Sequence, residues 1–271
     1  MQNLTKEIIK QCEKNPNKVD WTYLSGYVEL SEAFIEKYKN YVNWDYIFYH
    51  QKLSELFIKK FRDRVNWGEI SRNQVLSESF IEEFKDNVDW GDISYNQKLS
   101  ESFIEKFENK VNWLGISKCQ TLSESFIEKY KERVDWNVIS WYQKLSEPFI
   151  EKFKDRVNWD EISWHQLSEP FIEKFKDRVN WDKISTGQKL SEPFIEKFKN
   201  RVLWRKISWY QDLSESFIIK MKDYIDFSFL SVEKITANII NNCYDRINKV
   251  DKRKLKNKIV PQEIRLYYEV K

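Results

Sequence analysis

The sequence predicts an all-α protein, an α-solenoid of about ten short helical-hairpin repeats with degenerate capping units at both ends. The tripeptide Leu-Ser-Glu returns every 23 residues, with one step of 22, and such a period is typical of a solenoid. Each repeat also contains two segments with helical periodicity, and neither could bury its apolar side without a neighbouring repeat. The leucines of the tripeptide are Leu30, Leu53, Leu76, Leu99, Leu122, Leu145, Leu167, Leu190 and Leu213.

The pattern divides the chain into three parts. Residues 1–29 keep Trp21 and a threonine cap but stretch the first helix, as expected of an N-terminal capping unit. Tandem repeats occupy residues 30–231. Residues 232–271 leave the pattern and are expected to form a C-terminal capping segment of one or two helices, broken near Pro261, with an ambiguous strand-like tail, IRLYYEV.

The first segment of each repeat, called helix A, begins after the serine of the tripeptide, which is a good N-cap. In the repeat that starts at Leu30, an apolar stripe runs through Phe34, Tyr38 and Val42, which predicts a helix of three turns. The glutamates and lysines of the other side are expected to be solvated, with modest pairing at i,i+3 and i,i+4. Three copies place a proline in the first turn, where a missing N–H is tolerated: Pro148, Pro170 and Pro193.

The second segment, called helix B, starts with a tryptophan that follows an Asn or Asp N-cap. One face carries the tryptophan and the residues three, four and seven positions later, and we expect this face to be the core. In one repeat these are Trp136, Ile139, Ser140 and Gln143. The repeat tryptophans are Trp44, Trp67, Trp90, Trp113, Trp136, Trp159, Trp181 and Trp204, the last after an exceptional Leu203.

A leucine-rich solenoid is the alternative fold, because its period is similar and the segment VNWDEIS could form a short strand. Its diagnostic L-x-x-L-x-L-x-x-N spacing is absent from this sequence, so the helical alternative is preferred.

Composition indicates a soluble, intracellular, cytoplasmic protein. Charged residues make up 33% of the chain, but the net charge is only +3 and the two signs are interleaved, which argues against nucleic acid as the default partner. No apolar run is long enough for a membrane span or a signal peptide. The three cysteines, Cys12, Cys119 and Cys243, are odd in number and far apart, as expected of reduced thiols.

Searches for catalytic patterns find nothing that names a reaction, so we expect no enzyme activity, no cofactor and no metal. The only histidines, His50 and His165, lie far apart in sequence, and there is no glycine-rich phosphate loop, Cys-x-x-Cys or His-Glu-x-x-His. Cys119 is expected to be an isolated surface thiol rather than a nucleophile.

The repeated unit QKLSExFIEKFKDRVNWxxIS resembles the tandem repeats of uncharacterised proteins from large DNA viruses and bacteriophages, over roughly residues 20–231. The resemblance implies a virus-encoded protein that works in an infected cell, and so in the host cell cytoplasm. It brings no activity or catalytic residue with it.

Residues that change from repeat to repeat lie five and six positions after the tryptophan, roughly 140° and 240° around helix B from it, and so point away from the core. Aromatic and arginine residues on an outward face are typical of binding hot spots. The alternative is that they pack as a second core layer. The candidate partner-binding residues are Tyr49, His50, Arg72, Asn73, Tyr95, Asn96, Lys118, Trp141, Tyr142, Trp164, His165, Trp209 and Tyr210.

Two other features have a structural and a functional interpretation. The repeated glutamine, from Gln51 to Gln211, could bind a ligand, but a buried amide ladder between repeats fits a constant residue better. The basic run from Arg246 to Lys258 could contact nucleic acid or an acidic partner, but a solvated terminal helix is preferred.

The function that fits these patterns is a non-enzymatic solenoid that binds a protein, a host or defence factor if the viral resemblance holds. The alternative is nucleic-acid binding, in which Trp141, Trp164 and Trp209 stack on bases while lysines and arginines contact phosphates. Neither the partner's identity nor the oligomeric state is readable from the sequence.

Overall fold

The protein, described here by a computed structural model over residues 2–247, is all-α, so the helical prediction is confirmed and the leucine-rich alternative is wrong. The A helices are α1 (Lys6–Lys14), α3 (Glu32–Lys37), α5 (Glu55–Lys60), α7 (Glu78–Glu83), α9 (Glu101–Lys106), α11 (Glu124–Lys129), α13 (Glu147–Lys152), α15 (Glu169–Lys174), α17 (Glu192–Lys197) and α19 (Glu215–Lys220). The B helices are α2 (Trp21–Tyr27), α4 (Trp44–His50), α6 (Trp67–Asn73), α8 (Trp90–Asn96), α10 (Trp113–Cys119), α12 (Trp136–Tyr142), α14 (Trp159–Ile162), α16 (Trp181–Gly187) and α18 (Trp204–Tyr210). The other elements are the strands β1 (Gln2–Asn3) and β2 (Val28–Glu29), the 3-10 helices Pro16–Lys18, Arg62–Arg64 and Val232–Lys234, and α20 (Ala237–Ile247).

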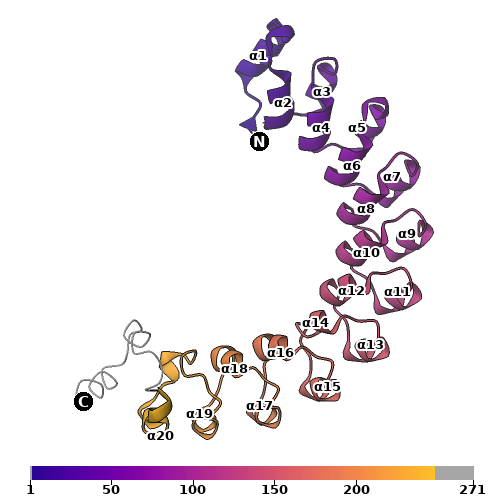
Figure 1. Ribbon diagram of the computed structural model, residues 1–271. Coiled ribbons are helices and arrows are strands. Elements are labelled where there is room, and N and C mark those ends of the chain that lie inside the picture. Colours follow the sequence, from indigo (N-terminus) through magenta and orange to yellow (C-terminus); the bar gives the residue numbers. More distant parts are fainter. Residues whose placement is uncertain (1, 248–271) are drawn as a thin grey trace. The chain divides into compact units, whose positions relative to one another are not determined.

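Contacts divide the chain into two compact units, the first ending at Gln143 and the second beginning at Lys144. Within each unit the repeats stack in order, with the A helices forming one layer and the B helices the other (Figure 1). Each B helix from α4 to α10 contacts the B helices before and after it, as expected of a solenoid in which every repeat is buried by its neighbours. The strands β1 and β2 pair in parallel in the first unit.

Helix A begins as predicted but is shorter. The hydroxyl of the tripeptide serine accepts a hydrogen bond from the amide three residues later, at 3.2 to 3.3 Å in every repeat from Ser31 to Ser214. The prediction of three turns is wrong, because the helix ends after six residues. At Tyr38 the backbone leaves helical geometry, and its carbonyl accepts from the amides of Tyr41 and Val42, which closes a tight turn. Val42 is therefore buried through a turn rather than a third helical turn.

The N-cap of helix B is also confirmed. An Asn or Asp side chain accepts from backbone amides in the first turn of α2 to α16, whereas Leu203 supplies no such bond to α18. The isoleucine of the predicted core face is buried in every helix B from α4 to α18, and so is the serine, for example Ile93 and Ser94, except in α4, where Phe48 takes the place of the serine and is buried too. The serine also joins neighbours, because the Ser94 hydroxyl donates to the Trp90 carbonyl and accepts from the Asn112 amide.

The repeat tryptophans do not lie fully in the core, which corrects one part of the predicted face. Each is half-buried. Most of their rings pack against the aromatic residue that ends the next helix A, with ring centroids 4.8 to 5.1 Å apart in pairs such as Trp90 and Phe107, whereas Trp204 packs against Tyr224. The indole N–H donates to the carbonyl five residues earlier, as from Trp90 to Lys85 at 2.9 Å. The tryptophan therefore joins both helices of its own repeat to the next repeat.

The glutamines form the buried amide ladder that the sequence favoured. The Gln97 amide group donates to the carbonyls of Ser71 and Gln74, at 2.8 and 2.7 Å, and its oxygen accepts from the Leu76 amide at 3.0 Å. Gln51, Gln74, Gln120, Gln143, Gln188 and Gln211 make the same kind of bonds. The side chain thus satisfies three backbone groups at the junction between two repeats, which would be costly to leave unpaired.

The charged face of helix A forms ion pairs between repeats, a contact that the prediction of pairing within one helix did not include. Lys197 bonds to Glu173 at 2.5 Å across 24 residues of sequence, and the pairs Lys60–Glu36, Lys106–Glu82, Lys129–Glu105, Lys174–Glu151 and Lys220–Glu196 repeat this contact. The first-turn glutamate also accepts from the next repeat's N-cap, as Glu101 does from the Ser123 amide at 2.5 Å and from its hydroxyl at 3.0 Å.

The 22-residue repeat is shortened in helix B, not in the loop. Helix α14 ends at Ile162, and the His165 carbonyl accepts from the Gln188 amide group, where other repeats use the carbonyl of their glutamine. Gln166 is exposed and makes one long bond, 3.4 Å, to the Gly187 carbonyl. Including Gln166 in the ladder was therefore wrong, because the missing residue moves His165 into the glutamine's place.

Both ends of the described chain continue the pattern. Thr5 caps α1 as the serines cap the later A helices. In the same way the Thr236 hydroxyl accepts from the Ile239 amide at the start of α20, whose backbone departs from helical geometry at Cys243. Helix α20 therefore resembles a further helix A. Pro261, the tail IRLYYEV and the basic run beyond Arg246 lie outside the described residues.

Candidate binding surface on the B helices

The outward side of the B helices, called the B face, carries the residues one, two, five and six positions after the tryptophan. Most of the changing residues on it are exposed, as predicted. Six of the predicted aromatic side chains are between 43% and 56% exposed, and Tyr27 on α2 is 56% exposed as well; the six are Tyr49, Trp141, Tyr142, Trp164, Trp209 and Tyr210. Rings that are half exposed along one side of a stack are accessible to a partner.

Some variable residues pack against the next repeat, so the second-layer alternative is partly correct. A methyl group on Gly187 would approach the Trp164 ring to 3.1 Å, and one on Gly115 would approach the Tyr95 ring to 2.9 Å. The small residue on one helix therefore accommodates the large ring on the helix before it. Tyr95 is half-buried for this reason, and His50, Thr186 and Gly187 are half-buried as well.

Aromatic residues gather at the N-terminal end of the first unit. Tyr27 lies 6.2 Å from His50 between ring centroids, and His50 lies 4.6 Å from Tyr49 and 5.7 Å from Tyr46. Tyr23 stacks on Tyr27 at 5.5 Å. These five side chains of α2 and α4 form one continuous aromatic surface, called the tyrosine patch.

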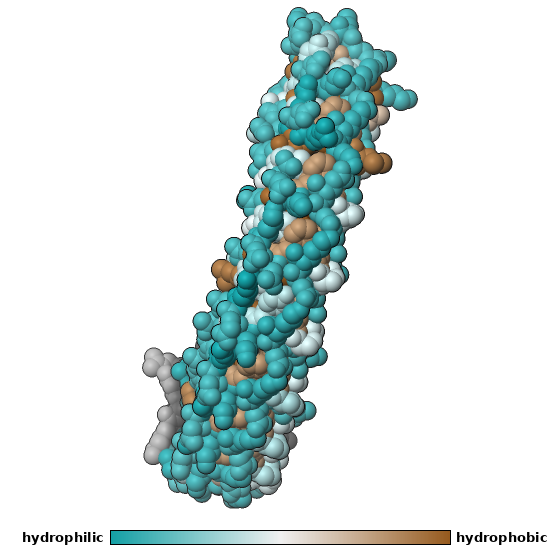
Figure 2. Space-filling model, turned by 90° about the vertical axis from the view of Figure 1, so that its right-hand side faces the viewer, coloured by the Kyte–Doolittle hydropathy of each residue, from teal (hydrophilic) through white to brown (hydrophobic). Residues whose placement is uncertain are grey.

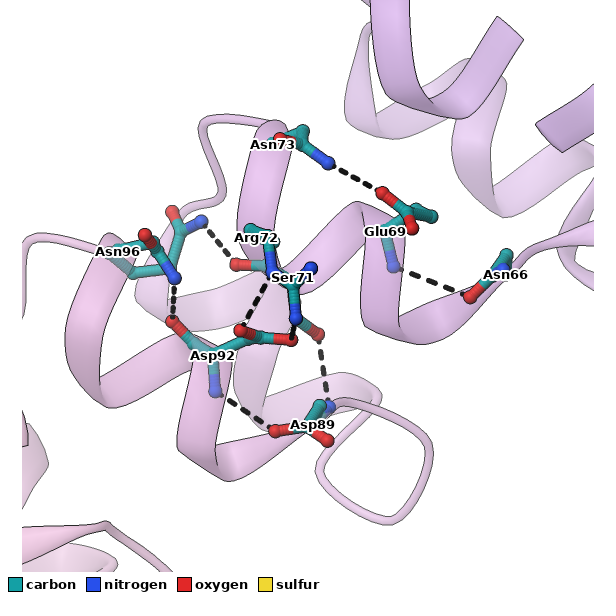
Figure 3. A network of polar contacts seen from close by, with 9 residues as sticks. Asn66, Glu69, Ser71, Arg72, Asn73, Asp89, Asp92 and Asn96 are labelled. Carbon is teal, nitrogen blue, oxygen red and sulfur yellow. Dashed lines mark hydrogen bonds and ion pairs between the residues drawn. The ribbon is translucent and has the colours of Figure 1, made fainter. Parts of the chain in front are cut away.

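The next two B helices carry a polar network instead (Figure 3). Arg72 donates to both carboxylate oxygens of Asp92, at 3.0 and 3.1 Å, and this pairing raises the pKa of the Arg72 guanidinium. Asn73 donates to Glu69 at 2.7 Å, and Asn96 donates to the Asp92 carbonyl at 2.9 Å. Three predicted site residues, Arg72, Asn73 and Asn96, therefore already donate hydrogen bonds to Asp92 and Glu69 of the same two helices.

The last B helices of the first unit return to aromatic character. The Lys118 ammonium lies 5.5 Å from the Tyr142 ring centroid, and Trp141 meets Tyr142 edge to face at 6.5 Å. Cys119 is exposed beside Lys118. Trp141 and Tyr142 belong to the first unit and Trp164 and His165 to the second, so the aromatic block expected from the sequence is divided between units that are each described separately.

In the second unit, aromatic rings and cations occur together. The Lys183 ammonium lies 5.8 Å from the Trp164 ring. Around α18, Trp209 stacks on Tyr210 at 5.4 Å and meets Phe229 at 5.1 Å, while the Arg205 guanidinium lies 4.3 Å above the Phe229 ring. The residues Leu203, Arg205, Lys206, Trp209, Tyr210 and Phe229 are called the α18 patch.

Sequence reasoning missed the B-face residues two positions after the tryptophan, including Tyr23, Tyr46 and Phe229, and also Tyr27 six positions after Trp21. Their variation between repeats was the available signal. One predicted residue is placed differently: His165 is half-buried at the position of a ladder glutamine. Its role in binding stays a prediction.

The A layer offers a different surface. The side on which α5, α7 and α9 lie in Figure 1 is mostly hydrophilic, with small separate apolar areas (Figure 2). Two strongly exposed aliphatic side chains, Leu56 and Val75, lie in the first unit.

Between residues 2 and 247 no group of three or more histidine, cysteine or acidic side chains is placed to hold a metal ion. Burial raises the pKa of the Cys12 and Cys243 thiols, which keeps them protonated and unreactive. None of the described helices has the length and apolar character needed to cross a membrane.

Comparison of the chain with protein-family models, with curated proteins and with solved structures finds no match.

Proposed function

We propose that this chain is a non-enzymatic solenoid that binds a protein partner through the B face. In the same proposal it is a virus-encoded protein that engages a host or defence factor in the host cell cytoplasm. The observation that carries the binding role is the half-exposed set of aromatic rings on the B face, at positions that change from repeat to repeat.

The division of labour within a repeat supports this proposal. The constant residues are occupied at junctions: Gln97 satisfies three backbone groups, and Trp90 joins one helix B to the next helix A. The rings of the B face have no comparable common bond. Trp and Tyr dominate binding hot spots because they supply a large contact area and lose little conformational freedom.

Nucleic-acid binding is the second candidate, and one observation favours it. Cations lie over exposed rings of the B face, as Lys118 does over Tyr142 and Lys183 over Trp164. Rings that stack on bases beside cations that contact phosphates are typical of single-strand binding. The two candidates differ in salt dependence, because phosphate contacts weaken steeply as ionic strength rises.

The test compares three forms of the chain as bait in an infected-cell lysate, with and without nuclease. These are the wild type, the double variant Trp141→Ser/Trp164→Ser, and the control Thr186→Ser, which keeps the hydroxyl that donates to the Asp182 carbonyl at 2.8 Å. We expect a protein captured by wild type and control, whatever the nuclease. The purified partner should bind the double variant at least about 30-fold more weakly, a loss of about 2 kcal/mol.

Melting curves of the three forms must accompany the capture. Equal retention of every protein by the folded double variant would contradict binding through these two rings. If the partner is no longer captured after nuclease treatment, or if its affinity for the chain falls steeply as salt rises, the result would favour nucleic-acid binding instead.

A further inference from the structure

Helix α18 breaks the pattern of the B helices at its first turn. Every earlier B helix is capped by an Asn or Asp side chain; at α16, Asn180 accepts from the amides of Asp182 and Lys183, at 3.0 and 3.3 Å. At α18 the cap is Leu203, whose side chain accepts nothing and is 38% exposed. Compared with the other B helices, α18 therefore lacks the side-chain hydrogen bond of the N-cap and has an exposed apolar side chain in its place.

Charge departs from the pattern at the same turn. The first turns of α4, α6, α8, α14 and α16 contain an acidic residue, and those of α2, α10 and α12 contain no charged residue, whereas that of α18 carries two cations, Arg205 and Lys206, and no acid. The partial positive charge of a helix N-terminus makes cations unfavourable there. Lys206 has one distant carboxylate partner, Asp182 at 3.9 Å, and no ion pair joins Arg205 to any carboxylate among residues 2–247.

These changes surround a set of stacked rings. Trp209 and Tyr210 are about half exposed and nearly parallel, with 12° between their planes. Phe229 contacts Trp209 with the two rings tilted by 34° and has Arg205 above it, and the Lys206 ammonium lies 5.8 Å from the Tyr210 ring. Cations, exposed rings and an exposed leucine therefore belong to the same helix and its neighbour.

Leu203 removes the cap of α18, and Arg205 and Lys206 place positive charge at the positive end of the helix dipole, so both changes destabilise the first turn. Both changes, however, add side chains that a partner can contact. We propose that the α18 patch binds an acidic, amphipathic protein segment, whose carboxylates meet Arg205 and Lys206 and whose apolar side chains meet Leu203 and Trp209. This inference rests on the proposed function, since it names the partner chemistry of one part of the B face.

An acidic protein segment fits the patch better than nucleic acid does. Leu203 offers an aliphatic surface that neither bases nor phosphates require. Acidic residues also lie nearby, since Asp182 is 3.9 Å from Lys206, and Asp212, two residues after Tyr210, is paired with Lys234 at 2.6 Å. The cations are thus confined to one helical turn, enough for a few carboxylates but not for a line of phosphates.

The experiment selects displayed random peptides of about twelve residues against the full chain, and measures the affinity of the best peptide for four forms. These are the wild type; Leu203→Asn, which restores the cap and keeps the cations; Leu203→Asn/Arg205→Asp, which restores the pattern of α16; and Lys189→Asp, which makes the same charge change at an exposed lysine outside the patch. Thermal melting is recorded for each form.

We expect selected peptides that combine several Asp or Glu residues with aromatic or aliphatic ones. Their affinity should fall at least about tenfold for Leu203→Asn/Arg205→Asp and less than about threefold for Lys189→Asp. The melting temperature of Leu203→Asn should rise, which separates a binding role from a structural one. Because the double variant regains its cap, loss of binding could not be ascribed to unfolding.

Four results of the peptide experiment would overturn the inference. These are no enriched peptides, enriched peptides that are neutral or basic, equal binding by Leu203→Asn/Arg205→Asp, or displacement of the peptide by a twelve-nucleotide oligo(dT) with steep salt dependence. The last would assign the patch to single-stranded nucleic acid. If lysate capture depends on Trp141 and Trp164 but not on α18, only this inference fails; if it depends on neither, the proposed function fails too.

Discussion

On helix A, the outward-facing glutamates and lysines bond to the repeats before and after, as Glu101 does to Ser123 and Lys197 to Glu173. On helix B, many outward-facing rings contact one another or a nearby cation, as in the tyrosine patch and around α18. The two layers have the same period and the same number of helices per repeat. A residue therefore stays constant where its side chain bonds across a junction, and varies where it does not.

The polar network of α6 and α8 tests that explanation, because it lies on the B face and yet is well bonded. Arg72 and Asp92 pair across neighbouring repeats, but no other repeat contains this pair of residues. One junction can thus be joined on the B face by a residue pair of its own, while the other repeats keep different residues at these positions. We expect partner contacts to favour the aromatic parts of the face on either side of this network.

The largest effect should come from the buried ladder. Replacing Gln97 with Ala leaves the Ser71 and Gln74 carbonyls and the Leu76 amide without their partner, so the free energy of unfolding should fall by about 3 to 5 kcal/mol. Chemical denaturation measures it. Gln166→Ala is the control, and because Gln166 is exposed its loss should stay below about 0.5 kcal/mol. Similar losses for the two variants would show that the ladder does not stabilise the junctions.

The next largest effect should come from the tryptophan that joins the layers. Trp90→Ala removes ring contacts with Phe103 and Phe107 and the bond to the Lys85 carbonyl, and should cost about 2 to 4 kcal/mol, less than for a fully buried ring. Trp90→Phe should cost about half as much, since Phe227 occupies this position in the last B segment. A loss below about 0.5 kcal/mol for Trp90→Ala would place the tryptophans with the variable surface instead.

These two predictions follow from features that the sequence revealed in part. Period, caps and the buried ladder were predictable because Leu, Ser, Asn and Gln recur at fixed spacing. The partners of the charged residues were not, because Lys60 and Glu36 are far apart in sequence and meet only once the repeats stack. The place of His165 was also hidden, since either a loop or a helix could have absorbed the missing residue.

The candidate surface was predictable to a similar extent. Positions five and six after the tryptophan were found from helical geometry, and most of their side chains are exposed. Position two lies roughly 200° around helix B from the tryptophan, between positions five and six, so the same helical geometry and its variation between repeats could have revealed it.

A smaller effect is expected when a ring of the B face is removed. Tyr49→Ser should change the free energy of unfolding by less than about 1 kcal/mol, because this side chain is 52% exposed and touches mainly His50. Denaturant titration against the wild type gives the value. A loss as large as that of Trp90→Ala would show that the tyrosine patch is structural, and the difference between the layers would disappear there.

The smallest effect is expected at low pH, where the carboxylate of Glu215 becomes protonated. Hydrogen bonds from the Thr236 hydroxyl, at 2.6 Å, and then from the Asn238 amide group, at 2.5 Å, hold the pKa of Glu215 below its ordinary value of 4.5. The carboxylate therefore adds stability above that value, and this contribution is lost as the pH falls through the lowered pKa.

Carboxyl chemical shifts followed against pH measure this pKa. Thr236→Val should raise it toward 4.5, and Asn238→Ala should raise it less, since the hydroxyl has the larger influence. A pKa unchanged in both variants would mean that the A-layer contacts do not stabilise the charged carboxylate.

The similarity of the junctions between repeats also predicts how the protein would unfold under a pulling force. Repeats in a stack that is pulled from its ends are loaded in series, and most junctions within a unit resist with the same set of glutamine, serine and glutamate bonds. Successive repeats should therefore yield at similar forces, each releasing roughly 70 Å of extended chain. A force–extension trace would then show evenly spaced steps, and uneven spacing would mean that several repeats rupture together. Such a protein would lengthen under load by whole repeats while those still folded keep their part of the binding surface.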